Sequence, residues 1–128
     1  VTPPGYEPDD AILKESQAIA DTNGCEIAVT NDLQEAAAGA DVIYTDVWAS
    51  MGQEAEAEER AKLFAPYQVN EKLLEEADEK CVILHCLPAH YGEEIDYPVS
   101  RTPNSAIFDQ AENRLHAQKA LMVLIAAS

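Results

Sequence analysis

The chain has 128 residues, of which 47% are hydrophobic and 25% charged, a composition typical of one folded domain rather than a disordered tail. Its 24 acidic and 8 basic residues give a formal net charge of −16, which argues against binding to nucleic-acid phosphates or anionic membranes. Three cysteines, Cys25, Cys81 and Cys86, are too few for a disulfide framework, so a reducing cytoplasm is the expected compartment. The longest apolar run, residues 120–127, is far below the roughly 20 residues of a membrane span.

The first half of the chain alternates helix signals with strand signals. Acidic residues mark the helix starts, because their side chains accept the free amide protons of a first turn, and glycines mark the ends. Segments rich in β-branched residues are predicted as strands. These patterns predict a helix capped by Asp9 or Asp10 and stopped at Asn23-Gly24, a strand at 25–30, a capping box at 32–35 that opens a helix ending at Gly39, and a buried parallel strand at 41–46.

The second half continues the alternation. It predicts an acidic helix at 54–65, a second helix at about 71–79 capped by Asn70, a strand at 81–85, a short strand at 106–108, and a helix from Asp109 to the end. Strands that alternate with helices at this spacing are typical of an α/β fold with a mostly parallel sheet.

Chemically unusual residues follow the predicted strands. In parallel sheets, ligands bind at the carboxyl ends of the strands. The segments that leave the sheet at that edge are 46–54 (DVWASMGQE), 85–90 (HCLPAH) and 109–116 (DQAENRLH). We therefore expect the functional site among these three segments.

Two of these segments carry charged candidates with ordinary alternatives. Asp46 can pair with a substrate ammonium, or it can cap the loop that follows it. Residues 50–52 suit a loop that closes over a ligand, or a plain strand–helix connection. Arg114 can hold a phosphate or carboxylate through two hydrogen bonds, or form a local ion pair with Asp109 or Glu112.

The remaining segment combines a histidine, a cysteine and a proline at a strand end. The proline stops the strand, and the backbone carbonyls and Cys86 can then face a ligand; a buried cysteine with a satisfied histidine is the alternative. A zinc site built from Cys81, His85, Cys86 and His90 is disfavoured, because Cys81 and Cys86 are expected on opposite faces of one strand. The sequence contains neither a phosphate-binding glycine motif nor a GxSxG elbow.

Taken together, DVWASMGQE, YQVN at 67–70, HCLPAH and FDQAENRLHAQKA resemble ornithine carbamoyltransferases. TPPGYEPD at 2–9 and TND at 30–32 are also similar, so the resemblance covers essentially the whole chain. It implies a three-layer Rossmann-like domain with a mostly parallel sheet: residues 1–128 would be most of the C-terminal, ornithine-binding domain, truncated at its N-terminal strand. The carbamoyl phosphate-binding domain, with its Ser-Thr-Arg-Thr loop, would be absent.

The resemblance also implies a reaction. The parent enzyme would transfer the carbamoyl group of carbamoyl phosphate to the δ-amine of L-ornithine, giving L-citrulline and phosphate in arginine biosynthesis or catabolism, with no metal or organic cofactor. A carbamoyltransferase for another amine, a non-catalytic amino-acid-binding module and an acidic interaction domain are the alternatives. By this resemblance, Asp46 would bind the ornithine α-amino group, and Ser50 and Met51 would belong to the closing loop. Cys86 and Leu87 would line the junction of the two substrates. His85 and Arg114 would lie on the carbamoyl phosphate side, and the catalytic set would be His85, Cys86 and Arg114.

A last expectation concerns assembly. In the family, the first strand of this domain lies at the centre of the sheet, so without it strand 42–45 loses a neighbour. The apolar end of the last helix, which in the family packs on the other domain, would also be uncovered. The parent enzyme is expected to be homo-oligomeric, and this chain is expected to self-associate by strand pairing or helix exchange.

Overall fold

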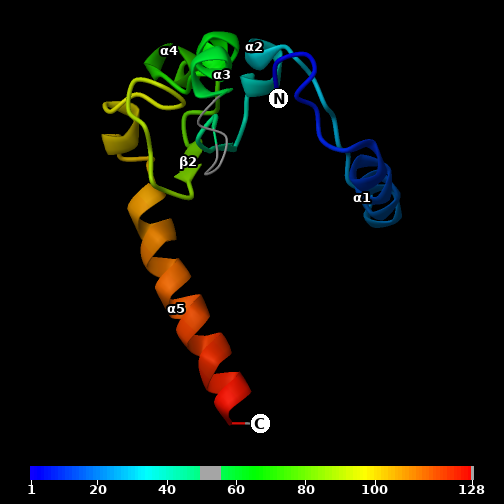
Figure 1. Cartoon of the computed structure of the whole chain (residues 1–128), viewed down its shortest axis with the longest axis vertical. Coiled ribbons are helices and arrows are strands. Elements are labelled where there is room, and N and C mark those ends of the chain that lie inside the picture. The colour runs from blue at the N-terminus through cyan, green and yellow to red at the C-terminus, as the bar shows by residue number, and fades with distance from the viewer. Residues whose placement is uncertain (50–55, 128) are drawn as a thin grey trace.

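The computed structural model describes residues 1–49 and 56–127. Figure 1 shows a small central body, with helix α1 to one side and the long helix α5 running away from it. The elements are α1 (Asp10–Asn23), α2 (Leu33–Ala37), β1 (Val42–Thr45), α3 (Ala57–Phe64), the 3-10 turn η2 (Ala65–Tyr67), α4 (Glu71–Leu74), β2 (Val82–His85), the 3-10 turn η3 (Val99–Arg101) and α5 (Ile107–Ala126).

The two strands form a parallel pair, as the alternation of elements predicts. Val42 lies opposite Val82, and Thr45 lies opposite His85. Beyond β2, residues 104–106 run alongside Ile83, whose amide donates to the Asn104 carbonyl at 3.1 Å and whose carbonyl accepts from the Ala106 amide at 3.0 Å. The α/β architecture is therefore confirmed, and it brings the ends of both strands to one edge.

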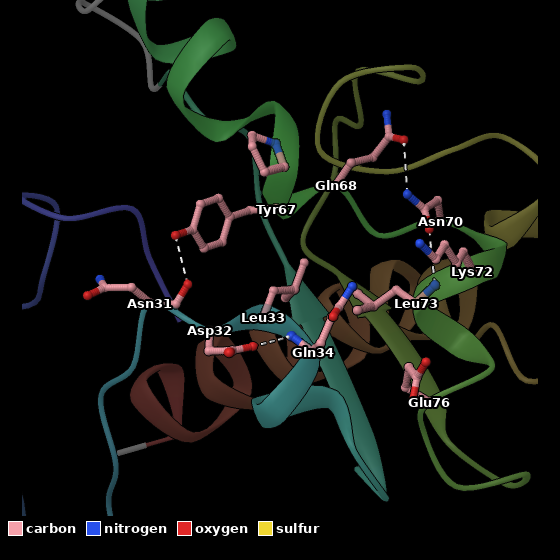
Figure 2. Close-up of a pocket in the computed structure, with 11 residues that line it drawn as sticks. Asn31, Asp32, Leu33, Gln34, Tyr67, Gln68, Asn70, Lys72, Leu73 and Glu76 are labelled. Atoms are coloured by element: carbon pink, nitrogen blue, oxygen red, sulfur yellow. Dashed lines mark hydrogen bonds between the residues drawn. The ribbon is translucent and has the colours of Figure 1, made fainter.

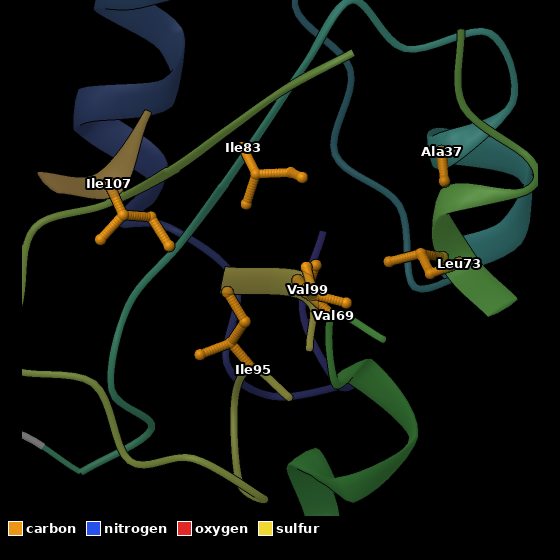
Figure 3. Packing of buried hydrophobic residues seen from close by; sticks show 7 residues of the cluster. All are labelled: Ala37, Val69, Leu73, Ile83, Ile95, Val99 and Ile107. Atoms are coloured by element: carbon orange, nitrogen blue, oxygen red, sulfur yellow. The ribbon is translucent and has the colours of Figure 1, made fainter. Parts of the chain in front are cut away.

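The core gathers apolar side chains from almost every element of the central body (Figure 3). Ile83 of β2 and Ile107 at the start of α5 are both fully buried, as are two residues of the connecting loops. Burying an isoleucine side chain contributes about 1.5–3 kcal/mol, so this cluster fixes β2 and the first turn of α5 against each other. Its members are Ala37, Val69, Leu73, Ile83, Ile95, Val99 and Ile107.

The helix ends largely follow their predicted caps. Asp9 accepts the amides of the first turn of α1, and Gly24 ends that helix with φ = 67°. The capping box of α2 is only half formed. Asp32 accepts the amides of Gln34 and Glu35, but the amide of Asp32 donates to Thr30 Oγ1 at 3.0 Å rather than to Glu35.

Two predicted strands are wrong. The segment 25–30 is not a strand, because among the described residues it makes no ladder: the Cys25 amide donates back to the Ala20 carbonyl of α1 at 2.9 Å, and the Thr30 carbonyl accepts the Thr2 amide at 3.3 Å. A strand needs a partner ladder rather than β-branched composition alone. The predicted strand 106–108 is instead the start of α5, and only Ser105 bridges to β2.

One predicted helix is much shorter than expected. Helix α4 stops at Leu74, whereas the acidic composition predicted a helix to about residue 79. Asp78 explains the difference, because its carboxylate accepts the Lys80 amide at 2.8 Å and its carbonyl accepts the Cys81 amide. These bonds form a turn that leads directly into β2, and a turn of this kind competes with helix.

An aromatic cluster joins three separate segments of the chain. The ring of Phe64 lies 4.9 Å from Tyr6, 6.1 Å from Trp48 and 6.3 Å from Tyr67, measured between centroids. The Arg60 guanidinium stacks 5.1 Å from the Tyr6 ring centre and also donates to the Trp48 carbonyl. Trp48, three residues after β1, is thereby held against α3, and α3 against the N-terminal segment.

Two apolar surfaces are exposed. On β1, Val42 and Tyr44 are 52% and 55% exposed. Near the end of α5, Leu121, Val123 and Leu124 are more than half exposed, and Figure 1 shows this helix extending away from the body. Among the described residues, no helix combines the length and hydropathy that crossing a bilayer requires.

Candidate substrate-binding site

Asp46 and Cys86 meet where the two parallel strands end. The Cys86 thiol donates to Asp46 Oδ1 across 3.0 Å, and the same oxygen accepts the Val47 amide at 2.7 Å. Asp46 thus caps its own loop, one of the two expected possibilities, while its side chain remains exposed. Both hydrogen bonds use Oδ1, and within residues 1–49 and 56–127 no hydrogen bond to Oδ2 is formed.

The neighbouring carboxylate keeps the thiol protonated. The hydrogen bond to Asp46 raises the pKa of Cys86 most, followed by partial burial and by the Asp46 charge, while the Cys86 backbone amide and the polar Tyr44 hydroxyl lower it by smaller amounts. A raised pKa means that Cys86 is a neutral thiol at physiological pH and acts there as a hydrogen-bond donor rather than as a nucleophile.

His85 is fully buried, and both of its ring nitrogens are occupied by groups of the chain. Nδ1 accepts the Leu87 amide at 2.8 Å, so the ring proton lies on Nε2, which donates to Glu94 Oε1 at 3.0 Å. Glu94 Oε1 also accepts the His90 amide at 2.7 Å. The imidazole therefore holds the turn after β2 and does not itself face a ligand, which differs from the substrate-side position that the resemblance implied.

That turn has an unusual backbone. Leu87 has φ = 54°, a left-handed conformation that is uncommon for a residue with a branched side chain, and the Leu87–Pro88 peptide bond is cis. The bond from the Leu87 amide to the His85 ring stabilises this conformation. As a result the segment 86–88 leaves the strand abruptly, next to Asp46.

The first turns of α5 connect to the same edge. Gln110 Oε1 accepts the His85 amide at 3.0 Å, and Gln110 Nε2 donates to the Tyr44 hydroxyl at 2.9 Å. Arg114 lies one turn further along the same face of α5 and is exposed. The ion pairs formed within the described residues do not include Arg114, so its guanidinium remains available to an anion.

The structure thus brings Asp46, Cys86 and Leu87 together, with Gln110 and Arg114 on the adjoining helix. Ser50 and Met51 lie outside the described residues.

Sequence reasoning did not single out Tyr44, Glu94 or Gln110. Gln110 lies inside the motif FDQAENR, which is a sequence signal for it, whereas no local pattern pairs Glu94 with His85.

Potential metal ligands form two groups within the described residues, one of Asp46, His85 and Cys86 and one of His90, Glu93 and Glu94. Cys81, which directly precedes β2, belongs to neither group. The four-residue arrangement considered from the sequence, with both cysteines and both histidines, is therefore not brought together.

A separate hollow of about 540 Å³ lies between α2 and α4 (Figure 2). The Tyr67 hydroxyl closes one side of it by donating to the Asn31 carbonyl at 2.9 Å. Asp32 and Asn70, which cap the two helices, also line it. None of the predicted site residues contributes to this hollow.

The link between Asp46 and Cys86 can be tested without a ligand. Because the Asp46 carboxylate raises the thiol pKa, Asp46→Asn is expected to speed the alkylation of Cys86 by iodoacetamide at pH 8 about three- to tenfold. Peptide mass spectrometry, with exposed Cys25 as an internal reference, measures the ratio. An unchanged ratio would show that the carboxylate does not control the thiol.

Comparisons with known proteins agree with this geometry. Residues 1–125 match the family model "Aspartate/ornithine carbamoyltransferase, Asp/Orn binding domain". The ornithine carbamoyltransferase of Anoxybacillus flavithermus is 60% identical over 122 residues, which are 95% of this chain and 39% of that protein.

Solved structures agree as well. The ornithine carbamoyltransferase of Pyrococcus furiosus superposes with a TM-score of 0.87 at 54% identity, over 95% of this chain and 39% of that one. The anabolic enzyme of Campylobacter jejuni gives 0.90 at 33% identity, over 99% and 42%. The chain spans about two fifths of the length of the relatives it matches. It belongs to the aspartate/ornithine carbamoyltransferase family, within the Asp/Orn binding domain.

Proposed function

We propose that this chain is the amino-acid-binding part of an ornithine carbamoyltransferase, whose parent enzyme transfers the carbamoyl group of carbamoyl phosphate to the δ-amine of L-ornithine. The observation that carries the proposal is the Asp46–Cys86 pair at the carboxyl edge of the parallel strands. The 60% identity to a relative named ornithine carbamoyltransferase supports the choice of amino acid.

Each residue of the site has a chemical part in this proposal. Asp46 Oδ2 binds the α-ammonium of ornithine, and the turn at Cys86 and Leu87 borders the junction of the two substrates. The lone pair of the neutral δ-amine forms a bond to the carbamoyl carbon as the bond from that carbon to the phosphate oxygen breaks, and the proton that the amine loses passes to the departing phosphate. Arg114 neutralises the leaving phosphate, while His85 positions the turn. Catalysis then rests on orientation and charge stabilisation.

A chimeric enzyme tests the proposal directly. Replacing the matching 39% of the Anoxybacillus flavithermus relative with this chain is expected to give an enzyme that forms citrulline from ornithine and carbamoyl phosphate. N-acetyl-L-ornithine is the matched control, because acetylation removes the ammonium charge that Asp46 would bind. A folded chimera that prefers the acetylated substrate, or another amine, would contradict ornithine as the acceptor.

On its own, the 128-residue chain is expected to form no citrulline above background. The sequence contains no Ser-Thr-Arg-Thr phosphate loop, and such a loop would supply much of the charge stabilisation for the leaving group. A colorimetric citrulline assay at micromolar protein decides this. Activity in the purified chain, absent from an Arg114→Ala control, would show that these residues suffice for catalysis.

The isolated chain is also expected to self-associate. The exposed edge of β1 and the apolar end of α5 are two surfaces whose burial would stabilise a dimer or larger oligomer, by strand pairing or helix exchange. Light scattering at micromolar concentration measures the mass. A monomer with cooperative unfolding would contradict the expectation.

The location proposed for the protein is the cytoplasm, and its three free thiols agree with that reducing compartment.

A further inference from the structure

We propose that Gln110 is a positioning residue, whose side chain holds the start of α5 across the ends of both strands and so fixes the distance between Asp46 and Arg114. Asp46 directly follows β1, and Arg114 lies one helical turn beyond Gln110. The roles of these two residues at the ammonium and phosphate of the substrates rest on the proposed function. The hydrogen bonds that tie Gln110 to the strands do not depend on it.

The side-chain oxygen of Gln110 replaces a backbone acceptor that the sheet loses where α5 begins. Ile83 bonds to residues 104 and 106 as in a parallel ladder. The next step of that ladder would bring the His85 amide to the Ala106 carbonyl. That carbonyl instead accepts the backbone amide of Gln110 at 2.8 Å, because the chain has turned into helix. Gln110 Oε1 takes its place and accepts the His85 amide at 3.0 Å.

The nitrogen end of the same side chain reaches the other strand. The His85 amide can only donate, so the atom that accepts from it is the oxygen of Gln110, and the NH₂ group lies at the opposite end. Gln110 Nε2 donates to the hydroxyl of Tyr44, on β1, at 2.9 Å. One side chain therefore connects β1, β2 and the first turn of α5, and both of its polar ends have a partner.

Arg114 depends on this first turn for its place. Ile107 is fully buried and Gln110 is partly buried, whereas the side chains of α5 are exposed from Glu112 onward. The ion pairs within the described residues do not include Arg114. A small tilt of the helix at Gln110 would therefore move Arg114 relative to the strand edge and leave Asp46 where it is.

Carbamoyl transfer is sensitive to such a shift. The reacting atoms must lie about 3–3.5 Å apart, and a misplacement of about 1 Å can lower the rate about 100-fold. Asp46 and Arg114 can each bind their own substrate whatever the distance between them, whereas the alignment of the amine with the carbamoyl carbon requires the correct distance. Loss of the Gln110 hydrogen bonds is therefore expected to lower kcat rather than to raise KM.

Steady-state kinetics of the active chimera measures this split. Gln110→Met keeps the length of the side chain and removes both hydrogen bonds, so we expect kcat about tenfold lower and each KM changed less than about twofold. Gln110→Glu is the matched control, because one carboxylate oxygen can accept the His85 amide and the other the Tyr44 hydroxyl proton. Its kcat is expected within about threefold of that of the unmodified chimera.

Three results in the chimera would overturn the proposal. The first is an unchanged kcat in Gln110→Met. The second is a rise of both KM values as large as the fall in kcat, which would indicate a general structural role. The third is an equal loss of kcat in Gln110→Met and Gln110→Glu, which would show that the hydrogen bonds are not what matters.

Tyr44→Phe tests the link to β1 separately. It removes one hydroxyl from a ring that is 55% exposed, so it keeps the proposal testable if Gln110→Met fails to fold by circular dichroism. We expect kcat about threefold lower. Because the hydroxyl acts through Gln110, adding Tyr44→Phe to Gln110→Met is expected to cause no further loss. Effects that multiply in the double variant would contradict the positioning role.

Amide hydrogen exchange in the full 128-residue chain tests the connection to β2 without any substrate. Gln110→Met removes the acceptor of the His85 amide, whose exchange, followed by NMR, is expected to become about three- to tenfold faster. The Ile83 amide, which donates to the Asn104 carbonyl, is the internal reference. Unchanged exchange at His85 would overturn the proposal. An inactive unmodified chimera would instead contradict the proposed function, and the exchange result would still decide whether Gln110 holds the strand ends.

Discussion

Glu94→Ala is expected to lower the free energy of unfolding by about 2–4 kcal/mol. The substitution removes the acceptor of the buried Nε2–H of His85 and of the partly buried amide of His90, and an unsatisfied buried donor costs about 1–3 kcal/mol. Both side chains of the His85–Glu94 pair are fully buried, so water cannot replace the lost acceptor. Urea unfolding at 25 °C, followed by circular dichroism, measures the change.

Glu94→Gln is the matched control. The amide oxygen of glutamine can accept both hydrogen bonds, and its NH₂ group replaces Oε2, a buried polar atom that already has no hydrogen-bond partner among the described residues. We therefore expect a change below about 1 kcal/mol. Equal destabilisation in the two variants would show that Glu94 stabilises the turn through its charge rather than as a hydrogen-bond acceptor.

In the active chimera, Asp46→Asn is expected to raise the KM for ornithine about tenfold or more and to leave that for carbamoyl phosphate nearly unchanged. A hydrogen bond between charged groups contributes about 1.5–3 kcal/mol, and asparagine removes the charge at almost constant shape. Arg114→Ala is the reciprocal control, with the larger loss expected for carbamoyl phosphate. Steady-state kinetics with each substrate varied in turn measures both KM values. Equal increases in the two KM values of Asp46→Asn would assign Asp46 a structural role.

The sequence allowed the parallel strands and their edge to be predicted, because β-branched runs alternate with helix signals along the chain. β1 and β2 follow from short β-branched runs, Gly24 ends a helix because a residue without a side chain adopts the left-handed conformation easily, and Asn70 begins one by accepting an amide with its side chain. The segment 25–30 has the same kind of composition but no ladder in the described structure. Strand formation depends on a neighbour, and a neighbour is a property of tertiary structure.

The contacts of the site also fall into those that the strand pattern predicts and those that depend on tertiary structure. Asp46 and Cys86 could be predicted as neighbours because they follow paired strands, 40 residues apart in the chain. His85 was expected to face a substrate, but its environment depends on Glu94, nine residues later, and on the turn between them. Gln110 contacts Tyr44 across 66 residues. Contacts of this kind follow from how helices pack on a sheet, and a single sequence does not record them.

The aromatic cluster around Phe64 gives the molecule an optical signal of its own. Trp48 is the only tryptophan in the chain, and it lies two residues beyond Asp46, packed against Phe64 and bonded through its carbonyl to Arg60. Indole emission depends on the polarity and contacts of the ring. Ultraviolet excitation above 295 nm therefore reports on one position, at the start of the loop that leaves the proposed ammonium site, with no dye or label attached.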